Sequence, residues 1–200
     1  MGMSMSPPIV HRRSWTRLDY DRVVESGGFG PEDRLELLDG EIWEMTPQGS
    51  RHAAVYSSVQ LALQQVFGTD YLVRCQLPRA LDDRSEPEPD LAVVEGTPFD
   101  YLEDHPTTAL LVVEMSDSSV EHDRGRKLAA YARNGIPEYW LFDLRAECLE
   151  AYRDPVATSY REKRVLRRGN SITPLSAHGT AIAIGNVLPP DDHPPTAPTP

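Results

Sequence analysis

The sequence predicts a mixed α/β (α+β) fold, in which helices flank a central mixed sheet and a β-hairpin stands near the N-terminus. Three observations support this class. Asp39-Gly40 separates two short strand-like segments, residues 51–67 and 118–134 show helical patterns, and residues 109–115 read as a continuous apolar run. Such a run is typical of a central strand that is covered on both faces.

The length of the chain favours one domain. At 200 residues it can bury one sizeable core, which argues against two full domains. We expect a flexible N-terminus over residues 1–15, one domain over residues 16–188 and a disordered Pro-rich tail over residues 189–200. No apolar run approaches the roughly 18 residues that span a bilayer, and the N-terminus has no apolar stretch of signal-peptide length. The sequence therefore predicts a soluble, cytoplasmic protein.

The formal charge of −11 argues against a nucleic-acid protein, because phosphate binding needs a locally positive surface. Two facts weaken this argument. Bound cations would offset part of the acidic charge, and arginines gather in two stretches, although solvated strand and helix faces are the plainer interpretation of such runs. The two stretches contain Arg12, Arg13 and Arg17, and Arg161, Arg164, Arg167 and Arg168.

Three helices are predicted from their caps. Thr16 with Asp19 fits a capping box, in which two side chains satisfy backbone N–H groups of the first turn, and Ser118 with Glu121 fits a second. Ser50 can cap another helix that has a broad apolar face. The predicted helices cover residues 17–25, 51–67 and 118–134.

Short apolar segments between these helices predict the strands. Asp39-Gly40 favours a type I′ turn because both residues tolerate positive φ, so the flanking segments form a hairpin. The predicted strands cover residues 34–38, 41–45, 71–77, 90–94, 109–115, 138–144 and 147–153, with weaker candidates over 160–166 and 181–187.

Two acidic residues stand at the ends of neighbouring strand candidates. Asp90 begins one strand, and Glu114 lies near the end of the next among apolar residues, where a lone buried carboxylate needs a cation or hydrogen-bond partners. Two such carboxylates can hold Mg²⁺ and leave positions open for water and a phosphate oxygen. The alternatives are that Asp90 is a turn residue after Pro89 and that Glu114 pairs with an arginine.

Lys127 is unusual in this composition, because the chain has 18 arginines and only two lysines, Lys127 and Lys163. An ammonium group is compact and, unlike guanidinium, can lose its proton when its surroundings lower its pKa. These properties suit orienting or deprotonating a water, or stabilising charge on phosphorus. The alternative is a surface lysine that pairs with Asp123 one turn earlier.

The motifs EPEPDLAVV, LLVVEMSDSS and DRGRKLAAYARNGIPEYWLFD occur in this order, after RLELLDGEIWEM and SRH. With them the chain resembles the Uma2 family of restriction-endonuclease-like proteins over about residues 20–153. The resemblance implies a PD-(D/E)XK nuclease fold, a Mg²⁺-type cofactor that Mn²⁺ can replace, and hydrolysis of DNA phosphodiester bonds. It also implies, by analogy, a homodimer, since cutting both strands needs two sites.

The resemblance gives Asp90 and Glu114 metal-binding roles and Lys127 a catalytic role. It departs from the usual motif at Ser116, which occupies the position two residues after Glu114 where a lysine normally stands. The cation would come instead from the following helix, where Lys127 lies, because geometry matters and sequence order does not.

Other residues look like additional members of the site: Glu36 or Glu41 in the hairpin, and His52 at the start of the long helix. Their alternatives are an exposed hairpin glutamate and a helix-end histidine. Tyr131, one turn after the lysine, is better interpreted as a packing or lysine-positioning residue.

Two functions from other classes are left open. The first is a non-cleaving relative that binds nucleic acid or a protein. The second is a phosphodiesterase for small nucleotides or RNA, which the acidic surface tolerates better than long duplex binding.

Overall fold

The centre of the molecule is a six-stranded mixed sheet. A computed structural model describes residues 12–30, 32–177 and 179–190. The only parallel neighbours in this sheet are its two middle strands, β5 and β6, and all other neighbours are antiparallel. The strands follow one another in space in sequence order: β3 (Tyr71–Cys75), β4 (Leu91–Glu95), β5 (Leu111–Ser116), β6 (Glu138–Asp143), β7 (Cys148–Val156) and β8 (Ser159–Leu166).

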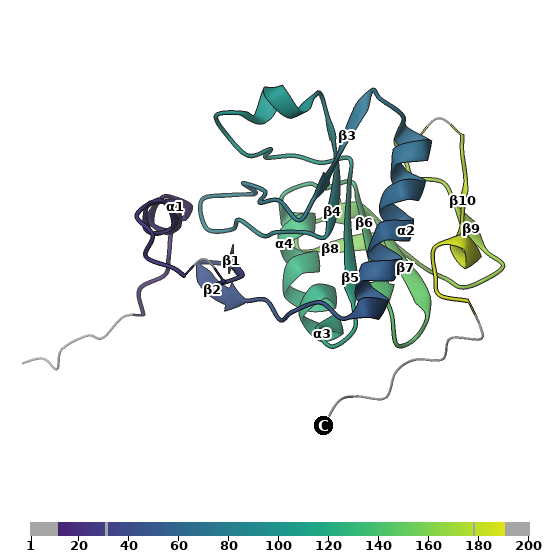
Figure 1. Cartoon of the computed structure of the whole chain (residues 1–200), viewed down its shortest axis with the longest axis horizontal. Helices are drawn as coiled ribbons and strands as arrows, with labels where there is room; N and C mark the ends of the chain where they lie inside the picture. The colour runs from purple at the N-terminus through teal and green to yellow at the C-terminus, as the bar shows by residue number, and fades with distance from the viewer. Residues whose placement is uncertain (1–11, 31, 178, 191–200) are drawn as a thin grey trace, which may run out of the picture.

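Helices cover both faces of this sheet (Figure 1). α2 (Ser50–Phe67) lies on one face and buries a stripe that recurs every four residues, as one side of a helix does. α4 (Leu128–Arg133) lies on the other. The predicted class, a mixed central sheet between helices with an N-terminal hairpin, is therefore confirmed. The stripe on α2 consists of Val55, Val59, Leu63 and Phe67.

The N-terminal hairpin pairs β1 (Leu35–Leu38) with β2 (Glu41–Glu44). Asp39 and Gly40 have φ values of 54° and 75°, as the predicted type I′ turn requires. Gly40 is constrained a second time, because a Cβ built there would lie 1.8 Å from Ser14 Oγ. The segment before α1 (Arg17–Glu25) thus crosses close over the turn. α1 itself begins as predicted, with Thr16 Oγ1 accepting from Asp19 N.

Two predicted caps are wrong. Gly49, and not Ser50, occupies the N-cap of α2, and glycine is acceptable there because it adopts the extended cap conformation. Ser119, and not Ser118, precedes the next helix, and its hydroxyl donates to Asp123 Oδ2 at 2.7 Å instead of capping the backbone.

The helix predicted over residues 118–134 is interrupted. It consists of α3 (Val120–His122), a π-helical segment η2 (Asp123–Lys127) and α4, which ends at Arg133. A π segment widens the helix and shifts which residues share a face, and such segments are frequent at functional sites. Lys127 is its last residue, so the irregularity sets the direction of this side chain.

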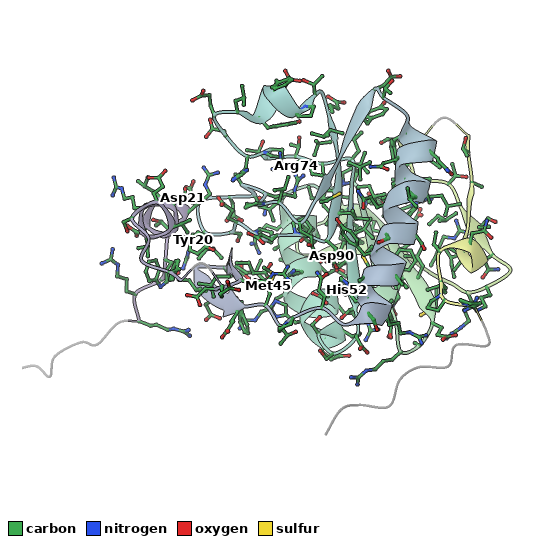
Figure 2. The ribbon with its side chains drawn as sticks, in the orientation of Figure 1. Tyr20, Asp21, Met45, His52, Arg74 and Asp90 are labelled. Carbon is green, nitrogen blue, oxygen red and sulfur yellow. The ribbon has the colours of Figure 1, made fainter. Side chains whose placement is uncertain are left out.

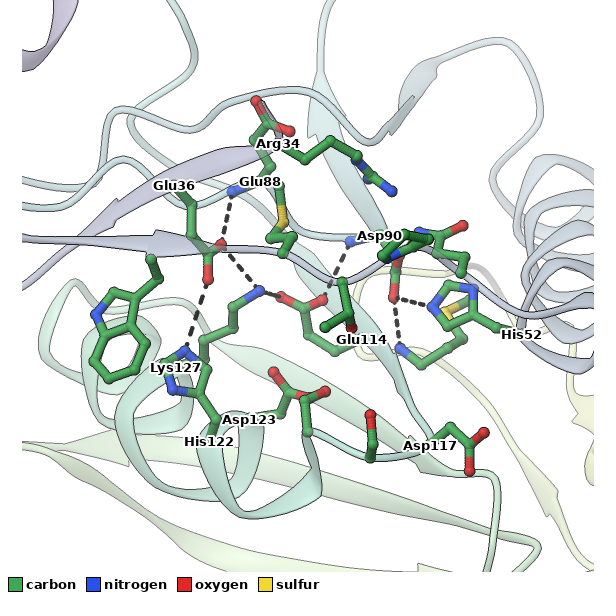
Figure 3. A pocket seen from close by; sticks show the side chains of 18 of the residues that line it. Arg34, Glu36, His52, Glu88, Asp90, Glu114, Asp117, His122, Asp123 and Lys127 are labelled. Atoms are coloured by element: carbon green, nitrogen blue, oxygen red, sulfur yellow. Dashed lines mark hydrogen bonds and ion pairs between the residues drawn. The ribbon is translucent and has the colours of Figure 1, made fainter. Parts of the chain in front are cut away.

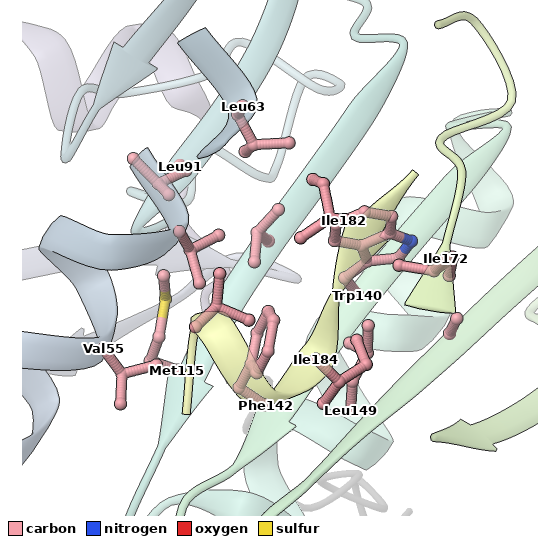
Figure 4. Close-up of a cluster of buried hydrophobic side chains, with 14 of the residues drawn as sticks. Val55, Leu63, Leu91, Met115, Trp140, Phe142, Leu149, Ile172, Ile182 and Ile184 are labelled. Carbon is pink, nitrogen blue, oxygen red and sulfur yellow. The ribbon is translucent and has the colours of Figure 1, made fainter. Parts of the chain in front are cut away.

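The predicted strand over residues 181–187 is also wrong in extent. Only β10 (Ile182–Ala183) is extended; it pairs with β9 (Ser171–Ile172), and the 3₁₀ turn η3 (Ile184–Asn186) follows. A further 3₁₀ turn, η1 (Pro98–Tyr101), lies between β4 and β5. In this region β9, β10 and η3 supply apolar residues to the core beneath α2 (Figure 4).

Some predictions concern residues beyond those described. Residues 1–11 of the expected flexible N-terminus and residues 191–200 of the expected tail lie outside the described residues. Within residues 12–30, 32–177 and 179–190, none of the helices combines the length and apolar character needed to cross a bilayer.

Candidate active site

A cleft of about 400 Å³ opens where β4 begins and β5 ends. These strands are antiparallel, with Leu91 opposite Val113, so the start of one meets the end of the other at the same edge. The hairpin, the start of α2 and the π segment complete the walls (Figure 3). The structure brings five predicted residues together here: Asp90, Glu114, Lys127, Glu36 and His52.

Lys127 is buried at the floor of this cleft, with 5% of its surface exposed. Its Nζ lies 3.0 Å from Glu36 Oε2 and 3.1 Å from Glu114 Oε1. Burial alone would lower the pKa of Lys127, but these two carboxylates raise the pKa well above its ordinary value. These contacts favour the ammonium form. Because the side chain is buried, the alternative of a surface lysine is wrong.

Glu36 reaches the lysine from the hairpin and is only 2% exposed. Burial would raise the pKa of Glu36, but the adjacent Lys127 and the hydrogen bonds to the carboxylate hold the pKa below its ordinary value. The backbone N–H of Glu88 donates to Oε2 at 3.3 Å, and His122 Nε2 lies 3.7 Å from Oε1. The hairpin thus contributes an ionised carboxylate that clamps the lysine.

Glu41, the other hairpin candidate, does not line the cleft. Its carboxylate pairs with Arg126 at 2.6 Å and with Arg12 at 2.9 Å. Of the two hairpin glutamates, Glu36 is therefore the one beside Lys127.

Glu114 is a second buried acid of the cleft, with 4% of its surface exposed. Its Oε1 accepts from Lys127 Nζ and, at 2.8 Å, from the hydroxyl of Tyr131, while its Oε2 accepts from the backbone N–H of Asp90 at 3.3 Å. Burial raises the pKa of Glu114 to about 8, against the opposing effect of Lys127 and with a further rise from Asp90. Tyr131 therefore contacts the acid directly and is not only a packing residue.

Asp90 stands one residue before β4 and is 7% exposed. Its Oδ2 accepts from Met115 N at 2.8 Å and lies 3.1 Å from His52 Nε2 (Figure 3). Figure 2 shows where Asp90 and His52 lie in the whole molecule, at the sheet and on α2. Its Oδ1 accepts from the side-chain amides of Gln48 at 3.1 Å and Gln76 at 3.4 Å. The acid is held by the neighbouring strand and by α2, so the interpretation as a simple turn residue is wrong.

Three residues in the walls of the cleft were not predicted from the sequence: Gln48, His122 and Trp43. The ring of His122 packs against Trp43 with centroids 4.7 Å apart. His122 precedes Lys127 by five residues, the spacing that a π turn places on one face. Because nothing in the sequence announces the π segment, only its proximity to the lysine could have drawn attention to His122.

The cleft offers carboxylate oxygens as ligands for a divalent cation. Among the residues that the structure describes, there is no group of three or more His, Cys, Asp or Glu arranged to hold a metal. Mg²⁺ does not need one, because one or two carboxylates commonly hold it, with waters and substrate phosphates as the other ligands. Asp90 and Glu114 fit that pattern. Both Asp90 oxygens already accept hydrogen bonds, of which the contact from Gln76 is the longest, so a cation would have to displace such a contact.

Comparisons with known proteins agree with this fold. The model of the Uma2 family, described as "Putative restriction endonuclease", matches residues 18–185. No curated protein matches the chain. Among solved structures, a "putative nuclease belonging to DUF820" from Anabaena variabilis ATCC 29413 has a TM-score of 0.64 and 18% identity, covering 78% of this chain and 90% of that chain. At this identity the likeness to the solved structure shows the fold alone.

Proposed function

Since the chain belongs to the Uma2 family, we propose that it is a divalent-metal-dependent nuclease that hydrolyses DNA phosphodiester bonds in the cleft of Asp90, Glu114 and Lys127. One observation carries the proposal: the buried ammonium of Lys127 lies within 3.1 Å of two buried acids, Glu36 and Glu114, at the floor of an open cleft that Asp90 also lines. Buried ion pairs of this kind are weak contributors to stability. A chemical role explains their presence better.

Asp90 and Glu114 are the proposed ligands of the cation, which is Mg²⁺ or Mn²⁺ in its place. Such an ion supplies Lewis-acid polarisation of a phosphate and a more acidic water. Neighbouring side chains orient the two acids. His52 and the amide of Gln48 contact Asp90, and the hydroxyl of Tyr131 donates to Glu114.

Lys127 has the role of a fixed positive charge. Its contacts with Glu36 and Glu114 favour the ammonium form, which suits charge stabilisation and orientation of water among the roles considered for it. Glu36 fixes the ammonium at 3.0 Å and so prevents it from swinging away from Glu114. Positioning by a buried partner is what preorganised electrostatic stabilisation requires.

The test is a nicking assay on supercoiled plasmid with the full chain, with Mg²⁺ and with a chelator. The proposal expects nicked product only with the metal, and its loss in Asp90→Asn. Asp117→Asn is the matched control, because Asp117 also lines the cleft but is half-exposed and pairs with Arg145 at 2.9 Å. Cleavage that persists in Asp90→Asn, or a chain that cuts no plasmid, would overturn the proposal.

A second candidate, a phosphodiesterase for small nucleotides or RNA, is favoured by the formal charge of −11, which opposes binding of a long polyanion. Parallel assays on duplex, single strand, RNA and a dinucleotide separate the two. Hydrolysis confined to the dinucleotide or RNA would favour this second candidate. Binding without hydrolysis of any of them would indicate a non-cleaving relative.

A further inference from the structure

A second groove, of about 390 Å³, lies against the hairpin beside the cleft. We call it the hairpin groove. Trp43 lines both spaces, so the groove and the cleft adjoin at this ring. The hairpin groove is lined by Arg12, Arg13, Trp15, Gly40, Glu41, Ile42 and Trp43.

The walls of the hairpin groove are held by backbone contacts. Trp15 N donates to Gly40 O at 3.0 Å, and Arg17 N donates to Asp83 O at 2.7 Å. Gly40 allows this approach because it lacks the Cβ that would meet Ser14. Trp15 is therefore fixed relative to Trp43, which stands on the same hairpin.

The hairpin groove is basic on an acidic protein. The side chains of Arg12 and Arg13 are 82% and 84% exposed. The guanidinium of Arg126 lies over the Trp43 ring, 4.7 Å from its centroid. Three guanidinium groups thus meet two carboxylates here, since Glu41 pairs with Arg12 and Arg126, and Asp19 pairs with Arg13. The local balance is positive in a chain of formal charge −11.

We propose that the hairpin groove binds a single-stranded stretch of nucleic acid that leads into the cleft; this rests on the proposed nuclease function. Proteins that bind single strands combine a positive groove, which follows the phosphates, with aromatic rings on which bases stack. Trp15, 36% exposed, offers such a ring beside two exposed arginines. Paired bases in a duplex are stacked on each other and cannot use it. The acidic remainder of the surface restricts the contact to a few nucleotides.

The test measures binding separately from cleavage. Fluorescence anisotropy with labelled 12-nucleotide DNA, the same sequence as RNA, and the DNA duplex is recorded in chelator for the full chain. Trp15→Ala should weaken single-strand binding about tenfold, while Trp15→Phe, which keeps a ring, should recover most of it. Duplex binding should change less than twofold. Equal losses for the DNA and RNA strands would identify the shared phosphate-and-base chemistry as the ligand.

The charge contribution has its own matched control. The double variant Arg12→Glu, Arg13→Glu should weaken single-strand binding. The slope of the logarithm of the binding constant against the logarithm of the salt concentration should become less steep by about 1.4, because two phosphate contacts are lost. Arg161→Glu with Arg164→Glu makes the same charge change on the exposed edge of β8 and should leave the salt slope unchanged.

These results separate the two proposals. If Trp15→Ala and the Arg12 and Arg13 variant bind like the native chain, or if duplex binding falls equally, the hairpin groove is not a single-strand site, whether or not the chain cuts DNA. If the losses appear but the native chain cuts nothing with Mg²⁺, the groove proposal holds and the nuclease proposal fails. Circular dichroism of each variant confirms that the fold is kept.

Discussion

The two faces of the central sheet are packed with different chemistry. Beneath α2 the side chains are mainly aliphatic, with Trp140 and Phe142 among them (Figure 4). Against α4 the layer contains four tyrosines, and the buried cluster of Lys127 and Glu114 lies beside it. The rings of these tyrosines pack 5.2 to 6.1 Å apart along the sheet, in the order Tyr131, Tyr139, Tyr152 and Tyr160.

Tyrosine suits the second face because its ring packs while its hydroxyl bonds a polar group. Tyr131 donates to Glu114, and Tyr139 donates to the backbone of Asp123 at 3.2 Å. β5 supplies both faces by alternation: Val113 and Met115 belong to the aliphatic cluster, whereas Glu114 points to the tyrosine side. One face is therefore mainly apolar, whereas the other also borders the charged cluster of the cleft, which the proposed function uses.

The largest expected effect is that of Lys127→Ala. It should lower the rate of DNA cleavage about 100- to 1,000-fold, because it removes a preorganised charge. It should also cost about 3 to 5 kcal/mol of unfolding free energy, because Glu36 and Glu114 are left buried without their cation. Single-turnover cleavage and urea unfolding measure the two effects.

Lys127→Arg keeps the charge and is the control for folding. It should recover most of the stability but leave the rate at least about tenfold low, because the planar guanidinium does not replace a compact ammonium. A folded Lys127→Ala chain that cuts at the native rate contradicts the role given to this residue.

On the aliphatic face the pattern should be reversed. Leu149 is fully buried beneath α2. Leu149→Ala should lower the unfolding free energy by about 2 to 5 kcal/mol, because it leaves a cavity in the core. At a temperature where the variant is folded, its cleavage rate should match that of the native chain. A large fall in rate with little loss of stability would erase the distinction between the faces.

A smaller effect is expected from Tyr131→Phe, which removes one hydrogen bond to Glu114. At pH 9, above the pKa of about 8 for Glu114, the acceptor is ionised. Bonds to charged groups contribute about 1.5 to 3 kcal/mol, so stability should fall by that amount at this pH and cleavage should slow about tenfold. Tyr160→Phe is the matched control, because its hydroxyl donates to Ile136 O at 2.9 Å, away from the cleft. It should cost about 1 kcal/mol of stability and no activity; equal losses of activity would remove the special role of Tyr131.

The smallest effect concerns Glu86, a buried acid on which the opposing effect of Arg17 is smaller than that of burial. Burial, with Asp21 and Glu88 adding to it, raises the pKa of Glu86 to about 7 from its ordinary 4.5. Between these two pH values the folded chain binds more protons at Glu86 than the unfolded chain does. The contribution of Glu86 to stability is therefore fully present below pH 4.5 and is lost as the pH rises through 7.

Glu86→Gln removes this penalty. It should raise the unfolding free energy by about 1 kcal/mol at pH 8 and leave it unchanged at pH 4. Urea unfolding at the two pH values measures the change, with Glu25→Gln at the exposed end of α1 as the control. A gain at pH 4 equal to that at pH 8 would mean that ionisation is not its cause.

The fold could be predicted from the sequence where local signals are strong. Asp39-Gly40 allows one kind of turn, and the apolar run that became β5 required a covered strand, so both elements follow from nearby residues. Asp90 and Glu114 were recognisable because acids at the ends of apolar strands are costly without a partner. The sequence also indicated Lys127 by its rarity among arginines.

The rest depended on distant contacts. The π segment ends at Lys127, whose Nζ lies 3.0 Å from Glu36, a residue 91 positions earlier on the hairpin. No local pattern encodes that contact. Glu36 and Glu41 lie on the same face of the hairpin, because Glu36 is paired with Trp43 and Glu41 stands two residues before Trp43. The choice between them depended on which part of the hairpin meets the cleft. Gln48 and His122 reach the site only through loop and helix geometry, so their residue types gave no warning.

The most direct test of the proposal that the acids of the cleft bind a cation is calorimetric titration of Mn²⁺ into the full chain without nucleic acid. We expect one binding event, whose affinity falls at least about tenfold in Asp90→Asn and changes less than twofold in Asp117→Asn. Equal affinity in the native chain and Asp90→Asn would contradict it, because the cation would then bind away from the acids on the tyrosine side of the sheet.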